Sequence, residues 1–180
     1  NTGAVNNTAV GSNALYGNVA KIESTAVGYR AMYNADNSAV TATTYNTALG
    51  AYALQGSATR SDNTGQTNTA IGHSALIGNT SGSGNVAVGS QALSSNTSNG
   101  GNTAIGHQAL ATNTGGENTA VGWGALISNI NGNNNTAIGN SAGNTVTTGS
   151  GNILLGYNVQ TPAATTSNYL NIGGAIYGDI

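Results

Sequence analysis

The sequence "NTAIGHQAL" at residues 102–110 decides the fold of this chain, because close copies of it recur along the chain. "NTAIGHSAL" stands at 68–76, "NTAVGWGAL" at 118–126 and "NNTAVGSNAL" at 6–15. An active site needs its motif once, whereas a phrase copied at a fixed period is the unit of a repeat architecture. The sequence therefore predicts stacked copies of one short structural unit.

The glycine inside each copy sets the period of the repeat. Successive glycines are 17 residues apart in six cases, 22 in two and 16 in one. A Val, Ile or Leu precedes every one of them, and alanine lies two residues before and three residues after the glycine in eight units. Leu or Met lies four residues after it in seven units. We call these residues the anchor glycines: Gly11, Gly28, Gly50, Gly72, Gly89, Gly106, Gly122, Gly139, Gly156 and Gly173.

Each unit predicts two short strands and a loop. The "NTAI" part alternates polar or small residues with branched ones, which is typical of a strand, and the glycine allows a bend or a close backbone approach. The Ala-Leu pair lies in a second short segment, and Asn, Gly, Ser and Thr form the connecting loop. Such a unit corresponds to one coil of a β-solenoid, whose coils stack about 4.8 Å apart.

We therefore expect an all-β, parallel β-solenoid of about ten coils over residues 1–160. Residues 161–180 are expected to form a cap or transition segment that continues the last coil. The extra residues of the two long units fall at 33–45 and 55–67, where we expect loops that protrude near Asp36 and Asp62. These loops are expected to lie beside the varied row, which is the row of residues that directly follow the anchor glycines. Solenoids often place such insertions on a binding face.

The composition narrows the classes of partner. The chain has 180 residues, with 3 Lys and Arg, 5 Asp and Glu and a formal net charge of −2. A chain without a basic run lacks what nucleic-acid binding needs, and no stretch is long and apolar enough for direct membrane insertion. The absence of cysteine excludes disulfides and thiolate metal sites, and no cofactor motif is present.

The small coil predicts association. Coils lined by Ala, Val and Ile bury little surface per residue, and small cores need a further source of stability. The Val/Ile row before the glycines and the Leu row after them would let identical rods pack side by side, so we expect an obligate oligomer. The sequence leaves open which row faces the coil interior and which faces a neighbouring chain.

The repeated phrase resembles a known family. "NTAVGSNAL", "STAVGYRAM", "NVAVGSQAL" and "NTAIGHQAL" are similar to the head repeats of trimeric autotransporter adhesins, the YadA-like heads, which also occur in phage tail fibres. The likeness covers residues 4–160. It implies a left-handed parallel β-roll, a homotrimer, and attachment to a cell-surface glycan or protein receptor. The implied location is extracellular, on a bacterial surface or a virion tail.

The C-terminal segment departs from this pattern. "TSNYLNIGGAIYGDI" at 166–180 has Asn171 in the alanine row and resembles the segment that precedes an endosialidase-type intramolecular chaperone in tail fibres. That likeness implies that Ile180 lies near the end of a mature fibre. Because Asn1 begins within a copy of the phrase, we interpret the sequence as a fragment or a processed product.

Two rows are candidates for function. The residue after each anchor glycine is the most varied in the unit, and Tyr29, Trp123 and Tyr157 in this row suit receptor contact. The alternative is that these rings pack at the seam of the trimer. The threonines three residues before the glycine could order water as ice-binding solenoids do, although an inward, packed position is expected to explain them.

Catalytic and metal chemistry find little support. His73 and His107 lie two coils apart, about 10 Å along the stack, which is too far to share one metal ion. The acidic residues show no pair at glycosidase spacing. We therefore predict a non-enzymatic fibre segment for adhesion. The alternatives are a purely structural spacer, an ice-binding solenoid and, least supported, a polysaccharide-cleaving spike.

Overall fold

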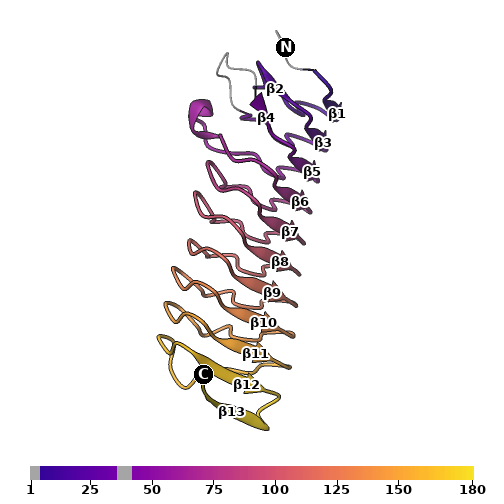
Figure 1. The fold of residues 1–180 in the computed structure, drawn as a ribbon. Coiled ribbons are helices and arrows are strands. Elements are labelled where there is room, and N and C mark those ends of the chain that lie inside the picture. The colour runs from indigo at the N-terminus through magenta and orange to yellow at the C-terminus, as the bar shows by residue number, and fades with distance from the viewer. Residues whose placement is uncertain (1–4, 36–41) are drawn as a thin grey trace.

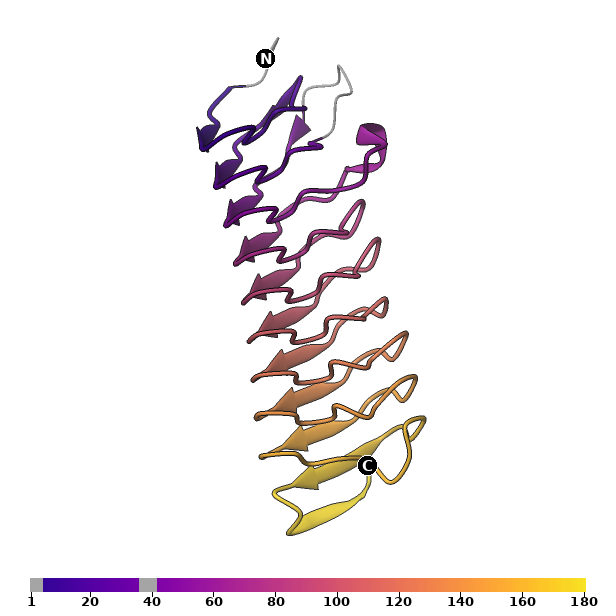
Figure 2. The ribbon, with the colours of Figure 1, turned by 180° about the vertical axis from the view of Figure 1, so that it is seen from behind.

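The computed structural model describes residues 5–35 and 42–180, and the residues outside these ranges include Asp36 and part of its predicted loop. Over the described residues the protein is all-β, a parallel β-solenoid of about nine turns without an α-helix. Figure 1 shows the coils stacked into a rod in which one strand of each coil points to the same side, and Figure 2 shows the same alignment from behind. The predicted parallel β-solenoid is confirmed.

One strand of each coil joins the main sheet. Its ten parallel strands are β1 (Thr8–Val10), β3 (Thr25–Val27), β5 (Thr47–Leu49), β6 (Thr69–Ile71), β7 (Val86–Val88), β8 (Thr103–Ile105), β9 (Thr119–Val121), β10 (Thr136–Ile138), β11 (Ile153–Leu155) and β12 (Tyr169–Ile172). Pairing keeps the repeat in step, since Thr103 faces Thr119, Ala104 faces Ala120 and Ile105 faces Val121. Ten parallel strands enclose about nine turns, whereas the sequence predicts about ten coils.

The last strand closes the sheet differently. β13 (Ile176–Asp179) folds back antiparallel on β12, after the tenth anchor glycine. Gly173 accordingly differs from the others, with φ near +60° and no neighbour within 4 Å of where a Cβ would lie. The nine earlier anchor glycines share a φ between +123° and +139°.

The return segment of each coil is an arc rather than the second strand that the sequence predicts. In the coil of Gly106, both Gln108 and Leu110 adopt positive φ, at 57° and 53°, which is incompatible with an extended strand. The arc still bonds to the next coil, because the Leu110 N–H donates to the Ala125 carbonyl at 3.0 Å. The prediction of two strands per coil is therefore wrong, although both segments stack.

Alanine and leucine fill the interior. From Ala26 to Ala137 the strand alanines are fully buried, and Leu76, Leu93, Leu110 and Leu126 of the return arc are also fully buried. The Val/Ile row lies on the other face of the strands, where Val10, Leu49, Ile105, Ile138 and Ile172 are exposed. The Leu row thus faces the interior, and the Val/Ile row faces outward.

Buried asparagines join the coils at the start of each strand. Asn118 shows the pattern: its backbone N–H donates to Asn102 Oδ1 at 3.0 Å, and its Nδ2 donates to the Gly132 carbonyl at 2.9 Å. Its own Oδ1 accepts from the Asn135 N–H at 2.9 Å. Equivalent ladder members are Asn68, Asn85, Asn102, Asn135 and Asn152, each at most 1 % exposed. These side chains satisfy buried backbone groups that would otherwise be left unpaired.

The two long coils keep the strands aligned. Thr25, Thr47 and Thr69 pair in register although 22 residues separate each from the next. One insertion contributes β4 (Ala42–Thr43), which pairs in parallel with β2 (Lys21–Ile22), and the other contains the 3₁₀ turn η1 (Arg60–Asp62). In Figure 1 this turn projects at the edge of the rod opposite the strand arrowheads. Asp62 therefore lies away from the anchor-glycine corner, not beside the varied row as expected.

Candidate binding surfaces

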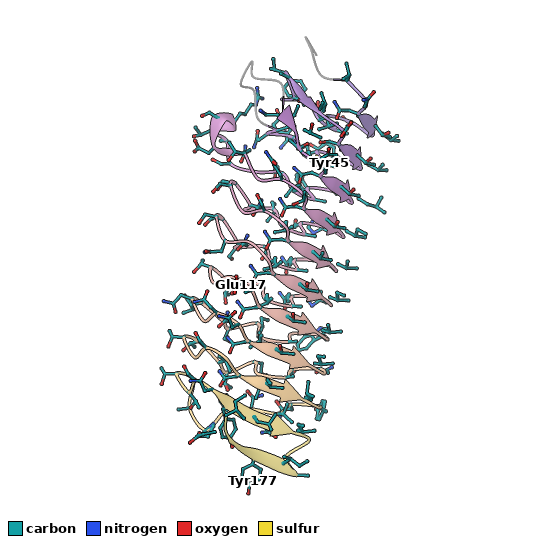
Figure 3. The ribbon with its side chains drawn as sticks, viewed as in Figure 1. Tyr45, Glu117 and Tyr177 are labelled. Carbon is teal, nitrogen blue, oxygen red and sulfur yellow. The ribbon has the colours of Figure 1, made fainter. Side chains whose placement is uncertain are left out.

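The outward face of the main sheet carries two parallel rows. In the main-sheet strands from β3 to β10 the middle alanine points inward, so the first and third residues point outward. The third residues form the Val/Ile row, of which five members expose between 37 % and 57 % of their surface: Val10, Leu49, Ile105, Ile138 and Ile172. Figure 3 shows side chains projecting in a line along the strand ends. The result is an apolar ridge along the rod.

The threonine row lies on this same outward face. Thr8 and Thr25 are exposed, and Thr103, Thr119 and Thr136 are half-buried. The expectation that these threonines point inward is wrong, because the interior at this point has room only for alanine. The row is interrupted by Val86, Ile153 and Leu170, as the sequence shows.

The varied row begins where each strand turns at its anchor glycine. Tyr29, Trp123 and Tyr157 expose 42 %, 52 % and 80 % of their surfaces. Trp123 is not bare on both faces, because the His107 ring stacks on it with centroids 6.0 Å apart and planes 11° from parallel. Gly124 beside it leaves space, since nothing lies within 4 Å of where its Cβ would be.

The structure separates the two histidines. His73 meets the edge of Tyr52 with centroids 5.8 Å apart, whereas His107 stacks on Trp123. Each therefore packs against an aromatic ring of a neighbouring coil. Within residues 5–35 and 42–180, no group of three or more His, Cys, Asp or Glu side chains could hold a metal ion.

Glu117 lies alone among amides on the loop side of the rod (Figure 3). It borders a polar hollow lined by Asn99, Gly100, Gly116, Asn133 and Asn134. Its backbone N–H donates to the Gly100 carbonyl at 3.1 Å, and its side chain is exposed. Glu117 is therefore a solvated loop charge.

Sequence reasoning missed a group of rings and guanidinium groups on the first coils. Tyr16 and Tyr33 stack with centroids 5.1 Å apart, and Arg30 and Arg60 contact these rings. The tyrosines are five residues after their anchor glycines, a position that holds Gln55 and Ile77 in the next coils. Their one sequence signal is the coincidence of two tyrosines at the same place in adjacent units.

Comparison of the chain with models of known protein families, with curated proteins and with solved structures gives no significant match. Among the residues that the structure describes, no helix has the length and apolarity needed to cross a membrane.

Proposed function

We propose that this chain is a segment of a non-enzymatic extracellular fibre on a bacterial surface or virion tail. In this proposal three copies, each wound as a left-handed roll, pack through their apolar ridges. The assembled fibre attaches to a glycan or protein receptor on a cell. The resemblance of the repeats to YadA-like heads supports the trimer and the handedness, and the exposed ridge supports association.

The apolar ridge is the observation that carries the proposal. Ten Val, Ile or Leu side chains follow one another in register along the sheet, on a chain with only 4 % charged residues. Soluble monomers rarely expose a large contiguous apolar patch, and fully burying one such side chain contributes about 1.5–3 kcal/mol. A second and third copy supply a ridge of matching length and spacing, because the repeat is the same in every chain.

The first prediction concerns assembly. Ile105→Asp or Ile138→Asp should abolish the trimer, since an unpaired carboxylate would be buried between the copies. Sedimentation of the wild type should give the mass of three chains, and the variants should run as monomers or aggregate. Ser95→Asp is the control, because Ser95 is exposed outside the sheet and should leave the trimer intact. A wild-type chain that sediments as a stable folded monomer would refute the proposal.

The second prediction concerns adhesion. Trp123→Ala should leave the trimer intact and weaken attachment to host cells or to a glycan array by about 2 kcal/mol or more, because an aromatic ring on a rigid scaffold is a typical binding hot spot. Ser90→Ala, at the same position of another coil, is the matched control. If the Trp123 variant attaches normally, the Trp123 ring has a packing role and does not contact the receptor. If the wild type attaches to nothing, the chain is a structural spacer.

Ice binding is the second candidate, because the threonines lie outward rather than inward. Thr103, Thr119 and Thr136 pair in register on adjacent strands, so their hydroxyls repeat at about the strand spacing of 4.8 Å. This function needs the sheet face free of partners. A monomer that slows ice growth, and loses this effect in Thr119→Leu, would favour ice binding over the fibre.

A further inference from the structure

Two of the three Lys and Arg residues and half of the eight tyrosines of this chain contact one another on the first coils. Tyr16, Tyr29, Arg30, Tyr33, Tyr52 and Arg60 form a continuous group that we call the arginine–tyrosine cluster. The chain has 3 Lys and Arg residues and 8 tyrosines in all. The clustering of two of those cations with four of those tyrosines is therefore not a property of the repeat, which is uncharged elsewhere on this surface.

The cluster is a stack with a guanidinium group near each end. The Arg60 guanidinium lies over Tyr16 at 5.6 Å from the ring centre, and Tyr16 lies parallel to Tyr33 at 5.1 Å with planes 7° apart. The Arg30 guanidinium lies over Tyr33 at 4.8 Å and also over Tyr29 at 5.4 Å. Tyr29 in turn meets the edge of Tyr52 at 5.3 Å.

The insertion at 55–67 delivers Arg60 to this stack. Arg60 begins the turn η1, and its side chain crosses to the first coil, where the missing side chain of Gly17 makes room for it. A Cβ at Gly17 would lie 2.8 Å from Arg60 Nε. The neighbouring carboxylate of Asp62 accepts a bond from Ser61 Oγ at 3.4 Å.

The two guanidinium groups contact aromatic rings but no hydrogen-bond acceptor of the described residues. Neither has a hydrogen bond or ion pair with a described residue, and Arg30 Nε is buried without an acceptor. The terminal nitrogens of Arg30 are not among the buried unpaired atoms, so they reach solvent. Each guanidinium carries five N–H donors in a planar fork that matches the two oxygens of a carboxylate.

We infer that the arginine–tyrosine cluster binds an acidic saccharide, with its carboxylate on the guanidinium groups and its sugar ring against the exposed edges of the tyrosines. Arg60 and Tyr33 cover the two faces of the Tyr16 ring, so its 61 % exposure leaves the ring edge open to a sugar, while the adjacent arginines supply the donors that a neutral sugar would not need. Cation–π contact already holds the guanidinium groups in place, so binding loses little side-chain entropy. This inference rests on the proposed adhesion and names the chemical class of its receptor.

The test uses defined probes and the assembled protein at physiological ionic strength. The probes are a tetrasaccharide of galacturonic acid and a trisaccharide of sialic acid, each beside its methyl ester, and calorimetry measures the dissociation constants. We expect one acid to bind at least tenfold more tightly than its ester. Arg30→Gln and Arg60→Gln should each weaken this binding tenfold or more. Arg60→Lys should bind more tightly than Arg60→Gln but less tightly than the wild type. Gln108→Ala, at the position of Arg30 in another coil, should change nothing.

The outcomes separate this inference from the adhesion proposal. It is overturned if neither acid binds, if an ester binds as tightly as its acid, or if the arginine variants bind as the wild type does. Loss of thermal stability in those variants without any saccharide binding makes the cluster a structural cap and also overturns it. If the wild type attaches to cells in any of these cases, adhesion stands and resides elsewhere on the fibre. If the wild type binds an acidic saccharide but attaches to no cell, the cluster is a saccharide-binding site and the adhesion proposal fails.

Discussion

Leucines in a left-handed conformation line the interior of every regular coil. The residue four after the anchor glycine has φ between 49° and 53° in Leu15, Met32, Leu54, Leu76, Leu93, Leu110 and Leu126. This conformation costs about 1–2 kcal/mol for a residue with a side chain. Full burial of a leucine returns about 1.5–3 kcal/mol, so burial decides the conformation. Sequence reasoning could not find these turns, because positive φ is expected of Gly, Asn and Asp rather than of Leu.

The anchor glycines were predictable from spacing alone, and their physical role is now specific. In eight of them a Cβ would lie within 3 Å of the backbone of the next anchor glycine along the stack, for example 2.6 Å from the Gly89 carbonyl oxygen in the case of Gly72. The corner is therefore a contact of backbone on backbone. Both the positive φ and the close approach exclude a side chain.

The third prediction follows from this contact. Gly106→Ala should lower the stability by more than about 3 kcal/mol or prevent folding, because its Cβ would overlap the Gly122 carbonyl at a φ of +139°. The midpoint of thermal unfolding at fixed protein concentration measures this. Gly124→Ala is the control: its φ is +60° and no atom lies within 4 Å, so only about 1 kcal/mol should be lost. Equal losses in the two variants would contradict a role for the backbone contact.

The buried asparagines stand in the motif itself, as the first letter of "NTAIG", yet sequence reasoning assigned asparagine to loops. A polar residue beside a strand is usually exposed, so its default position is the surface. The signal that could have found the ladder is the position of Asn four residues before the anchor glycine in units where the preceding loop varies. A varied loop followed by a constant polar residue indicates a structural hydrogen bond.

At the level of the strand, the direction of the two apolar rows could not be predicted. Both rows have the spacing of the coil, and a strand of three residues is too short for alternation to identify its inner face. The width of the coil decides it. The interior beside the strand accommodates Ala104 and its equivalents, and the larger Ile105 must point outward.

In two adjacent coils a small arc residue is compensated by a large strand residue. Gly143 takes the place of the arc leucine, and Leu154, fully buried on the strand of the next coil, takes the place of an alanine. A Cβ at Gly143 would lie 2.7 Å from Leu154 Cδ1 and 2.9 Å from Leu126 Cδ2. The side chain of Leu154 thus fills the space that the glycine leaves. This explains why the Leu row ends at Gly143 without a gap in the core.

The fourth prediction is a double-variant cycle across this exchange. Leu154→Ala should cost about 2–5 kcal/mol by leaving a cavity, and Gly143→Leu should be destabilising because it overlaps Leu154. The double variant restores the pattern of the other coils, so it should be at least about 2 kcal/mol more stable than the sum of the two changes. Thermal unfolding of the four proteins measures the coupling. Additive losses would show that the two positions do not share one space.

A shorter coil has a visible cost in hydrogen bonding. A second row of buried asparagines runs through Asn79, Asn96, Asn113 and Asn129, and Asn96 Nδ2 donates to Asn79 Oδ1 at 2.9 Å. In the 16-residue unit, Asn113 Nδ2 donates to the Gly115 carbonyl and does not reach Asn96 Oδ1. Asn96 Oδ1 is therefore buried without a partner. Asn129 Oδ1 is also unpaired, because the next coil has Val146 at this position.

At the scale of the whole molecule, the repeat makes the stack of coils predictable, but it does not predict the features that depart from the repeat. Parallel pairing and register follow from the period, since identical units pair with themselves. The arginine–tyrosine cluster joins residues as far apart as Tyr16 and Arg60, and it depends on where an irregular insertion returns to the rod. The hairpin of β12 and β13 likewise belongs to the last unit, in which Asn171 takes the place of the strand alanine.

The fifth prediction treats a coil as a removable part. Deleting residues 90–106, which lie between two anchor glycine positions, joins Gly89 to His107 and leaves every other strand in register. The shortened protein should keep its circular dichroism spectrum and its oligomeric state, with a modest fall in melting temperature. Deleting residues 90–97 alone removes half a coil and should prevent folding. Equal damage from both deletions would contradict the independence of the coils.

The interchangeable coil has a consequence for the gene. Because each unit of the sequence is one coil, an in-frame loss or gain of one whole unit in the gene removes or adds one whole coil. The protein that results is already in register, and its exposed ridge changes by the length of one coil. The length of the rod is therefore a heritable quantity that changes in discrete steps. The cluster on the first coils would be carried unchanged through such steps, at a variable distance from the closing hairpin.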